Sequence, residues 1–357
     1  MVSPVTLCFF SFSLFVFGFT FCEAQKVPAM FVFGDSLVDV GNNNYLKVSV
    51  VKANFPHNGI DYPGKKPTGR FSNGKNPADF LAEKVGLPIS PPYLSLPKSS
   101  KSREFLTGVS FASGGAGILN GTNERYRQAI SLAKQVEYYS AVREAIVQQL
   151  GSAGAQDHLS KSLFAIVIAS NDLLAYSRSR SNARKESNPQ HYVDQMVLQL
   201  NGLLKRMHSL GARKYVITGI GALGCCPRQR SHNKTGECNE EANNWSLNYN
   251  EGLKSMLQGF KSEFKDINYS YFDAYNAFLS FIQKPATYGF SEVKAACCGL
   301  GNLKAQSPCV PIATYCPNRS DHIFWDIYHP TEAAARIVVD IIFYGSQKYV
   351  FPMNLKQ

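Results

Sequence analysis

The sequence of 357 residues has no Lys or Arg in its first 24 positions and no nucleic-acid-binding motif. It also has no linker rich in Pro, Gly and Ser, no block of like charges and no internal repeat, which predicts one domain rather than a string of modules. After the N-terminal segment, no apolar run approaches the length of a membrane span. These absences exclude an integral membrane protein with several spans, and they give no support to DNA or RNA as a partner despite the formal net charge of +11.

The N-terminal segment is apolar and aromatic from Val5 to Phe21, and Ala24 closes a stretch typical of a cleavage site. We expect residues 1–24 to be a cleaved signal peptide, although the missing basic start departs from the usual pattern. An uncleaved membrane anchor is the alternative, but the run is short and no basic cluster follows it. Cleavage would leave 25–357 as one domain with a net charge of +12, because Glu23 is the only charged residue removed. Such a charge suits association with acidic cell-wall polymer or anionic lipid, while solubility alone also explains it.

Cysteine usage favours export. Seven cysteines remain after cleavage, and all lie beyond residue 220: Cys225, Cys226, Cys238, Cys297, Cys298, Cys309 and Cys316. Their spacing does not match zinc-binding pairs, so disulfides are expected, with at least one thiol unpaired because the number is odd. N-glycosylation sequons point the same way and occur at Asn120, Asn233, Asn268 and Asn318, with a poorer one at Asn244. The sequence therefore predicts a secreted, extracellular glycoprotein.

Strand-like and helical patterns alternate along the chain. Apolar runs predict strands at 30–33, 105–113, 163–168, 215–220 and 269–272, and helical spacing predicts helices at 76–86, 123–150, 192–210, 240–264, 274–282 and 331–344. Strands that are apolar throughout are typical of a parallel sheet buried on both faces. We therefore expect an α/β fold in which a mostly parallel sheet lies between helix layers.

Two segments carry residues suited to hydrolytic chemistry. Ser36 follows the first predicted strand at the sheet edge where ligands gather, although Gly-Asp-Ser alone also describes an ordinary turn. Asp326 lies three residues before His329, so a turn can let the carboxylate orient the imidazole as a base for a serine. A structural histidine and a solvated acid are the alternatives.

Two further segments can stabilise negative charge. Asn171 follows the strand at 163–168 and has an amide that can donate to an oxyanion, or that simply ends the strand in an Asx turn. The small residues at 113–117 leave backbone N–H groups accessible, or form only a tight turn.

These segments resemble the conserved blocks of the plant GDSL esterase/lipase family, within the SGNH hydrolases. The matching stretches are Gly-Asp-Ser-Leu (34–37) with Val-Asp-Val-Gly-Asn-Asn-Asn (38–44), Gly-Arg-Phe-Ser-Asn-Gly (69–74), Phe-Ala-Ser-Gly-Gly-Ala-Gly (111–117), Ser-Asn-Asp (170–172) and 324–332. They occur in family order and cover nearly all of the mature chain.

The resemblance implies a flavodoxin-like three-layer α/β/α fold and a serine esterase that needs no metal or cofactor. It assigns Ser36 as nucleophile, His329 as general base and acid, and Asp326 as the residue that orients it. The oxyanion hole would use the Ser36 N–H, the Asn171 amide and the N–H of Gly117, which is preferred to that of Gly115.

The sequence departs from the family pattern at two places. Ala169 stands where a glycine is usual, and its methyl group can shift Asn171. Cys226 is an additional cysteine and is the candidate for the unpaired thiol, with Cys225 paired to Cys238. For Cys297, Cys298, Cys309 and Cys316, all three connectivities remain open.

We expect a secreted hydrolase of carboxylic esters that works through an acyl-enzyme. Acyl transfer to another alcohol is an alternative, because the same intermediate serves both reactions. A non-catalytic glycoprotein that binds wall polymer or lipid is the alternative from another class. Long-chain lipid, cutin-like polyester and acetylated polysaccharide all remain open as substrates.

Overall fold

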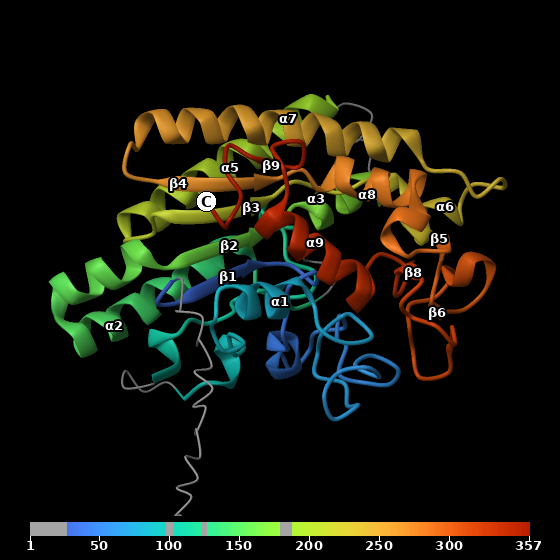
Figure 1. Cartoon of the computed structure of the whole chain (residues 1–357), viewed down its shortest axis with the longest axis horizontal. Helices are drawn as coiled ribbons and strands as arrows, with labels where there is room; N and C mark the ends of the chain where they lie inside the picture. The colour runs from blue at the N-terminus through green and yellow to red at the C-terminus, as the bar shows by residue number, and fades with distance from the viewer. Residues whose placement is uncertain (1–26, 98–102, 123–126, 179–187) are drawn as a thin grey trace, which may run out of the picture.

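The central sheet has five strands in the order β1-β2-β3-β4-β9 (Figure 1). The computed structural model describes residues 27–97, 103–122, 127–178 and 188–357, so the predicted signal peptide at 1–24 lies outside it. β1 to β4 are parallel and β9 is antiparallel to β4. The strands are β1 Met30–Gly34, β2 Leu163–Val167, β3 Lys214–Thr218, β4 Asn268–Phe272 and β9 Val350–Phe351. The predicted α/β fold with a mostly parallel sheet is confirmed.

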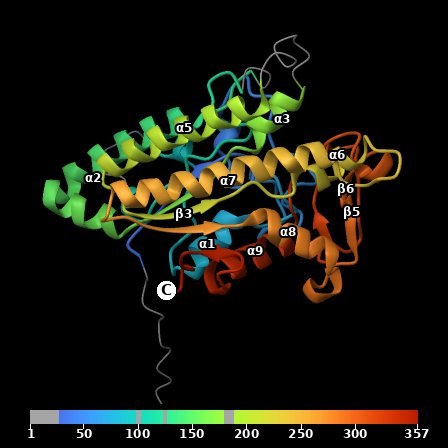
Figure 2. The same cartoon turned by 90° about the horizontal axis from the view of Figure 1, so that it is seen from above.

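Helices cover both faces of this sheet, and Figure 2 shows the two layers from above. One layer contains α2 Leu132–Lys161, α5 Pro189–Ser209 and α7 Glu240–Glu263. The other contains α1 Pro77–Lys84, α8 Ala274–Gln283 and α9 Glu332–Tyr344. Aromatic side chains of the strands fill the space under the first layer, where Tyr139 of α2 lies against Phe31 and Phe164 with ring centroids 5.5 and 5.3 Å away.

Local sequence explains where most helices begin. Asn76 caps α1 and forms a reciprocal capping box with Asp79, and Pro77 occupies the first turn. Thr331 caps α9 by accepting from the N–H of Ala334. The helix predicted at 331–344 therefore begins one residue later, at Glu332, because the threonine hydroxyl makes residue 331 the N-cap.

The strand predicted at 105–113 is also wrong as a regular element. Arg103–Leu106 forms a 3-10 helix (η3), and the next residues run beside β1 with bridges only at Ser110. Gly108 has φ +112°, and a Cβ there would clash with the backbone of Met30, so the chain approaches β1 too closely for a regular ladder. The segment nevertheless lies on the far side of β1 from β2, since the N–H of Phe111 donates to Val32 O at 2.8 Å.

The helix predicted at 123–150 begins and ends later than expected. Residues 123–126 lie outside the described part, and α2 starts only after the Ser131 cap. It continues to Lys161 across a break at Gly151, where φ is +70°. α3, Ser170–Arg178, was not predicted, because the small polar residues at its start also fit a turn.

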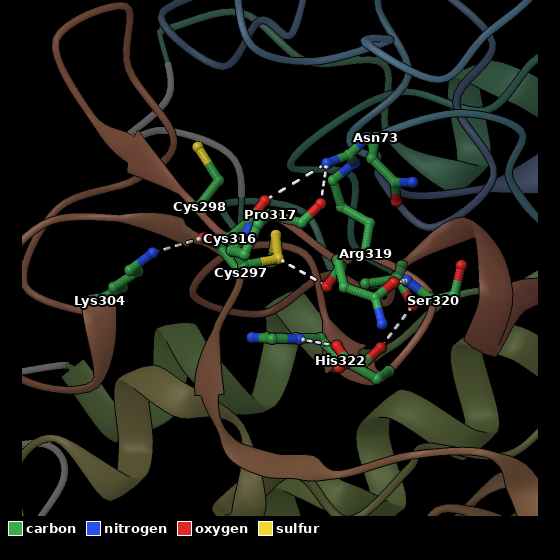
Figure 3. Close-up of a disulfide and its surroundings, with 12 residues drawn as sticks. Asn73, Cys297, Cys298, Lys304, Cys316, Pro317, Arg319, Ser320 and His322 are labelled. Atoms are coloured by element: carbon green, nitrogen blue, oxygen red, sulfur yellow. Dashed lines mark hydrogen bonds and ion pairs between the residues drawn. A yellow bond between two sulfur atoms is a disulfide. The ribbon is translucent and has the colours of Figure 1, made fainter.

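Three disulfides lie between residues 225 and 316. Cys225 pairs with Cys238, and Cys226 is a buried free cysteine, as predicted. The open connectivity is resolved as Cys297–Cys316 and Cys298–Cys309. Figure 3 shows the first of these pairs beside Arg319, whose guanidinium binds both carboxylate oxygens of Asp61 at 2.7 and 2.8 Å. Two short pairings, β5 Glu292–Ala296 with β8 His322–Phe324 and β6 Cys298–Gly299 with β7 Thr314–Tyr315, complete this region.

The sequon asparagines lie at the surface. Asn120, Asn244, Asn268 and Asn318 are exposed, whereas Asn233 is half-buried and bonds to Thr235. Within the described ranges, none of the helices combines the length and apolar character needed to cross a membrane.

Candidate active site

The turn after β1 brings Ser36 to the carboxyl edge of the sheet. Gly34 has φ +154°, and a Cβ at this position would clash with the carbonyl oxygen of Val167 on β2. The N–H of Asp35 donates to that same oxygen at 3.0 Å. Only a glycine permits this close approach, which turns the chain sharply and leaves Ser36 half-exposed.

The side chain of Gln135 in α2 fixes this turn through two hydrogen bonds. Its amide oxygen accepts from the N–H of Gly34 and its amide nitrogen donates to Gly34 O, both at 2.8 Å. Gln135 is completely buried. Sequence reasoning missed this residue, although a glutamine on the same helical face as Leu132, Val136 and Tyr139 was a visible signal, because a buried amide requires partners.

His329 bridges Asp326 and Ser36. Its Nδ1 lies 2.7 and 2.8 Å from the two carboxylate oxygens of Asp326, and its Nε2 lies 2.7 Å from Ser36 Oγ. An ionised carboxylate only accepts hydrogen bonds, so Nδ1 carries the proton and Nε2 is free to accept from the serine hydroxyl. The three predicted residues, separated by almost the whole chain, are therefore in hydrogen-bond contact.

A short turn after β8 positions Asp326 and His329. The backbone N–H groups of Tyr328 and His329 donate to Asp326 Oδ1 at 3.0 and 2.9 Å, which holds the carboxylate in place. Trp325 is buried just before it and donates from its indole to Asn58 at 3.0 Å. The ring of Phe71 stacks on His329 with centroids 5.0 Å apart. The imidazole is thus constrained on both its carboxylate side and its face.

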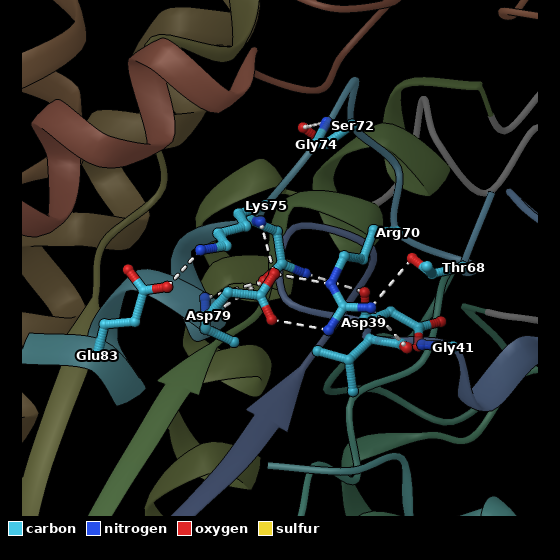
Figure 4. Close-up of polar contacts among 12 residues, drawn as sticks. Asp39, Gly41, Thr68, Arg70, Ser72, Gly74, Lys75, Asp79 and Glu83 are labelled. Carbon is cyan, nitrogen blue, oxygen red and sulfur yellow. Dashed lines mark hydrogen bonds and ion pairs between the residues drawn. The ribbon is translucent and has the colours of Figure 1, made fainter. Parts of the chain in front are cut away.

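The loop that carries Phe71 is connected to α1 and to residues 39–40 by hydrogen bonds. Arg70 makes a bidentate ion pair with Asp79, at 2.7 Å for both bonds, in a buried position (Figure 4). Its guanidinium also reaches Val40 O at 3.3 Å. The Asn76 amide adds a bond to Asp39 O at 2.9 Å, so residues 39–40 and the start of α1 together support the wall of the site that carries Phe71.

Asn171 lines the same cavity as Ser36. One hydrogen of its amide is used, because Nδ2 donates to Ala116 O at 3.0 Å. A primary amide has a second hydrogen. The bond to Ala116 fixes the orientation of the amide and leaves that hydrogen available to a ligand.

Gly117 and Gly115, the two candidates for the second backbone donor, lie in different surroundings. Gly117 is packed beneath the site, where a Cβ would clash with Thr122 and lie 2.7 Å from an Asp172 carboxylate oxygen. Gly115 has φ +83° and lines the cavity instead. Among the described residues, no hydrogen bond is made by the N–H of Gly115 or by that of Ser36. Gly117 leaves no room for a side chain, and the position of Gly115 in the cavity wall supports it as the donor in the proposal below.

The charges in the triad shift its pKa values. Burial of the imidazole disfavours its protonation, but the negative charge of Asp326 and the hydrogen bond to it outweigh burial, so the pKa of His329 lies above its usual value. Burial alone would raise the pKa of Asp326, yet His329 and the hydrogen bonds that the carboxylate accepts lower it. Asp326 thus remains ionised while it orients the imidazole.

Two further carboxyl groups are buried beneath the site. Burial raises the pKa of Asp35 to about 7, opposed by the bond from the Leu37 N–H and by the charge of His329. Burial likewise raises the pKa of Asp172 to about 6, although it accepts from Thr122 and from the N–H groups of Ile118 and Leu119. These acids organise the surrounding loops and do not contact the serine hydroxyl.

Ala169 lies at the end of β2 with φ +101° and no exposed surface. This backbone conformation favours glycine, which is a physical reason for the glycine usual in the family pattern at this position. The strain does not prevent the Asn171 amide from contacting Ala116 O.

A cavity of about 480 Å³ opens at Ser36. Its wall includes Phe71 and His329 at the catalytic end, and the free cysteine Cys226. Burial raises the pKa of this thiol to about 12, so the thiolate form is suppressed at neutral pH. The volume falls within the range of sites that enclose a small organic molecule.

Comparison with known proteins gives a consistent result. Residues 30–342 match the family model described as GDSL-like Lipase/Acylhydrolase. The protein named GDSL esterase/lipase At5g55050 from Arabidopsis thaliana is 51% identical over 342 residues, which are 94% of this chain and 90% of the relative. Two others from the same plant, named GDSL esterase/lipase At3g50400 and GDSL esterase/lipase LTL1, are 39% and 38% identical and align with 99% and 97% of this chain, and with 96% and 94% of their own lengths.

Proposed function

The chain belongs to the GDSL-like lipase/acylhydrolase family, and we propose that it hydrolyses carboxylic esters through an acyl-enzyme formed on Ser36. The observation that carries the proposal is the continuous line of hydrogen bonds from Asp326 through His329 to the serine hydroxyl, with 2.7 Å at each step. Serine is a weak nucleophile at neutral pH, and a neutral imidazole at this distance can take its proton as attack occurs.

The reaction proceeds in two halves. Ser36 Oγ attacks the ester carbonyl while His329 Nε2 accepts its proton, and a tetrahedral oxyanion forms. His329 then donates that proton to the departing alcohol, which leaves the acyl group on the serine. In the second half, water attacks the acyl-enzyme while His329 takes a proton from it, and His329 then returns that proton to Ser36 Oγ as the acid is released.

The oxyanion is stabilised by three donors in this proposal: the Ser36 N–H, the Gly115 N–H and the second hydrogen of the Asn171 amide. This choice of donors is supported by the location of the three residues, which all line one cavity. Each donor of this kind contributes about 3 to 4 kcal/mol to transition-state stabilisation in other serine hydrolases.

We test the proposal by hydrolysis of p-nitrophenyl butyrate by the purified mature protein, its Ser36→Ala variant and a control, Ser209→Ala, at an exposed serine of α5. The Ser36→Ala variant is expected to lose at least about 10⁴-fold in kcat, whereas the control keeps its rate. A fluorophosphonate should label the Ser36 peptide of the wild type only. Equal background rates for all three proteins would contradict the proposal.

The cellular setting is part of the same proposal. We infer that residues 1–24 direct secretion and are removed, and that 25–357 form a single extracellular domain. Three disulfides and several exposed sequons support an oxidising compartment. The positive charge favours retention by acidic wall polymer, which elution by salt from a cell-wall fraction would test.

A further inference from the structure

The cavity at Ser36 extends far beyond the catalytic residues. It continues along the face of the sheet that α1, α8 and α9 cover, the second layer in Figure 2. From the helices it is lined by Leu81, Phe278, Ile282, Val338 and Ile342. From the sheet it is lined by Val32, Ala165, Val167, Val216, Thr218 and Phe272. Val167, Thr218, Phe278 and Ile282 keep accessible surface, whereas Val32 and Phe272 have none, so the space narrows inward from the carboxyl edge of the sheet and closes against the core.

The strand register explains why this space exists. Val32, Ala165 and Val216 are paired side by side on β1, β2 and β3, so their side chains point to the same face. The bulky aromatic residues at alternate positions, Phe31 and Phe164, point to the opposite face and pack against α2. The small side chain of Ala165, which is 3% exposed, lies with Ile342 of α9 at the closed inner end of the space.

The chemistry of the wall changes along the cavity. At the catalytic end it has the hydroxyl, imidazole and amide groups that act on the ester. Along the sheet, the side chains that line the described cavity are apolar except for the hydroxyl of Thr218. Water molecules need two or more polar partners to be retained in such a space, whereas a hydrocarbon chain needs none.

We propose that this extension binds the acyl chain of the substrate, so that the natural esters carry a long, unbranched fatty acyl group rather than an acetyl group. This inference rests on the proposed acyl-enzyme at Ser36. The carbonyl carbon lies at the serine and the hydrocarbon tail enters between the sheet and α9, where Ala165 and Ile342 limit its length. An acetyl group would leave almost all of the extension empty.

The first test compares p-nitrophenyl acetate, butyrate, octanoate and palmitate. Each added methylene that enters an apolar cavity is expected to raise kcat/KM by about fourfold, until the cavity is full. The Ala165→Leu variant should lower the ratio of the octanoate to the acetate rate by at least tenfold. Ile342→Ala should instead shift the preference toward palmitate. The control is Ala145→Leu, the same change at a buried alanine of α2 on the opposite face of the sheet, which should leave the ratio unaltered.

The second test does not depend on turnover. Ser36→Ala protein should bind palmitate, measured by calorimetry, and the additional Ala165→Leu change should weaken this binding while Ala145→Leu does not. Ser36-dependent acetate hydrolysis with a flat chain-length profile and no palmitate binding would overturn the inference and leave the hydrolase intact. Palmitate binding that Ala165→Leu weakens, without any ester hydrolysis, would support the acyl site and contradict the proposed catalytic function.

Discussion

Removal of the Asn171 amide tests most directly whether the polar end of the cavity stabilises an oxyanion. The amide is positioned by one hydrogen bond, to Ala116 O at 3.0 Å, and its second hydrogen is available to the substrate. In the Asn171→Ala variant, the transition state loses one donor. This loss corresponds to about 3 to 4 kcal/mol, or a decrease in kcat of about 10² to 10³-fold. The Ser36–His329 contact at 2.7 Å does not involve the amide and should remain.

The two kinetic constants distinguish this role from a structural one. A donor that acts on the oxyanion lowers kcat and leaves KM nearly unchanged, because the ground-state carbonyl interacts with it only weakly. Loss of the bond to Ala116 should reduce the free energy of unfolding by only about 1 kcal/mol. Stability is measured by denaturant unfolding, and kcat and KM by p-nitrophenyl butyrate hydrolysis.

Two further variants make the test sharper. Asn171→Asp preserves size but places a carboxylate, which accepts and does not donate, beside the developing negative charge, so it should lose at least as much in kcat. Asn276→Ala, at an exposed asparagine of α8, is the control and should keep the wild-type kcat. A decrease of less than tenfold in kcat for Asn171→Ala, or a loss confined to KM, would refute the assignment.

Three other measurements follow from the structure. The kcat/KM of the wild type should fall as the pH drops through the raised pKa of His329, because a protonated imidazole cannot accept the serine proton. The Asp326→Asn variant should move this acidic limb of the profile to lower pH and reduce kcat by about 10⁴-fold. A pH-independent rate would contradict the assignment of His329 as the base. The Ala169→Gly variant should have an unchanged free energy of unfolding or one raised by up to about 1 kcal/mol, measured by denaturant unfolding. Relief of about 1 to 3 kcal/mol of backbone strain offsets the larger entropy of the unfolded chain and the lost methyl contact. A decrease of more than about 1 kcal/mol would show that the positive φ is not strained. Cys226 should resist a thiol reagent in the native, non-reduced mature protein and react as a single thiol after unfolding, so reaction of the native protein, or of no thiol after unfolding, would contradict its assignment as the buried free cysteine.

The sheet and most helices were predictable because their signals are local. The continuous apolar run at 163–168 predicted a strand buried on both faces, and residues 163–167 form β2. Asn76 and Pro77 marked the start of α1 through their own capping chemistry. The predictions failed where distant contacts decide the backbone, as at Gly108, whose close approach to Met30 interrupts a segment that has the composition of a strand.

The sequence by itself determined the family, the alternating α/β order and the identity of the hydroxyl, imidazole, carboxylate and amide at the site, because these depend on motifs and on local periodicity. Only the tertiary structure decided that Gly115 lines the cavity while Gly117 packs beneath it, that Gln135 holds the nucleophile turn, and how the last four cysteines pair. It also revealed the apolar space beside Ala165, which is lined by residues of strands β1 to β4 and of helices α1, α8 and α9. Such features depend on atoms that are far apart in sequence, and no local pattern records the distances between them.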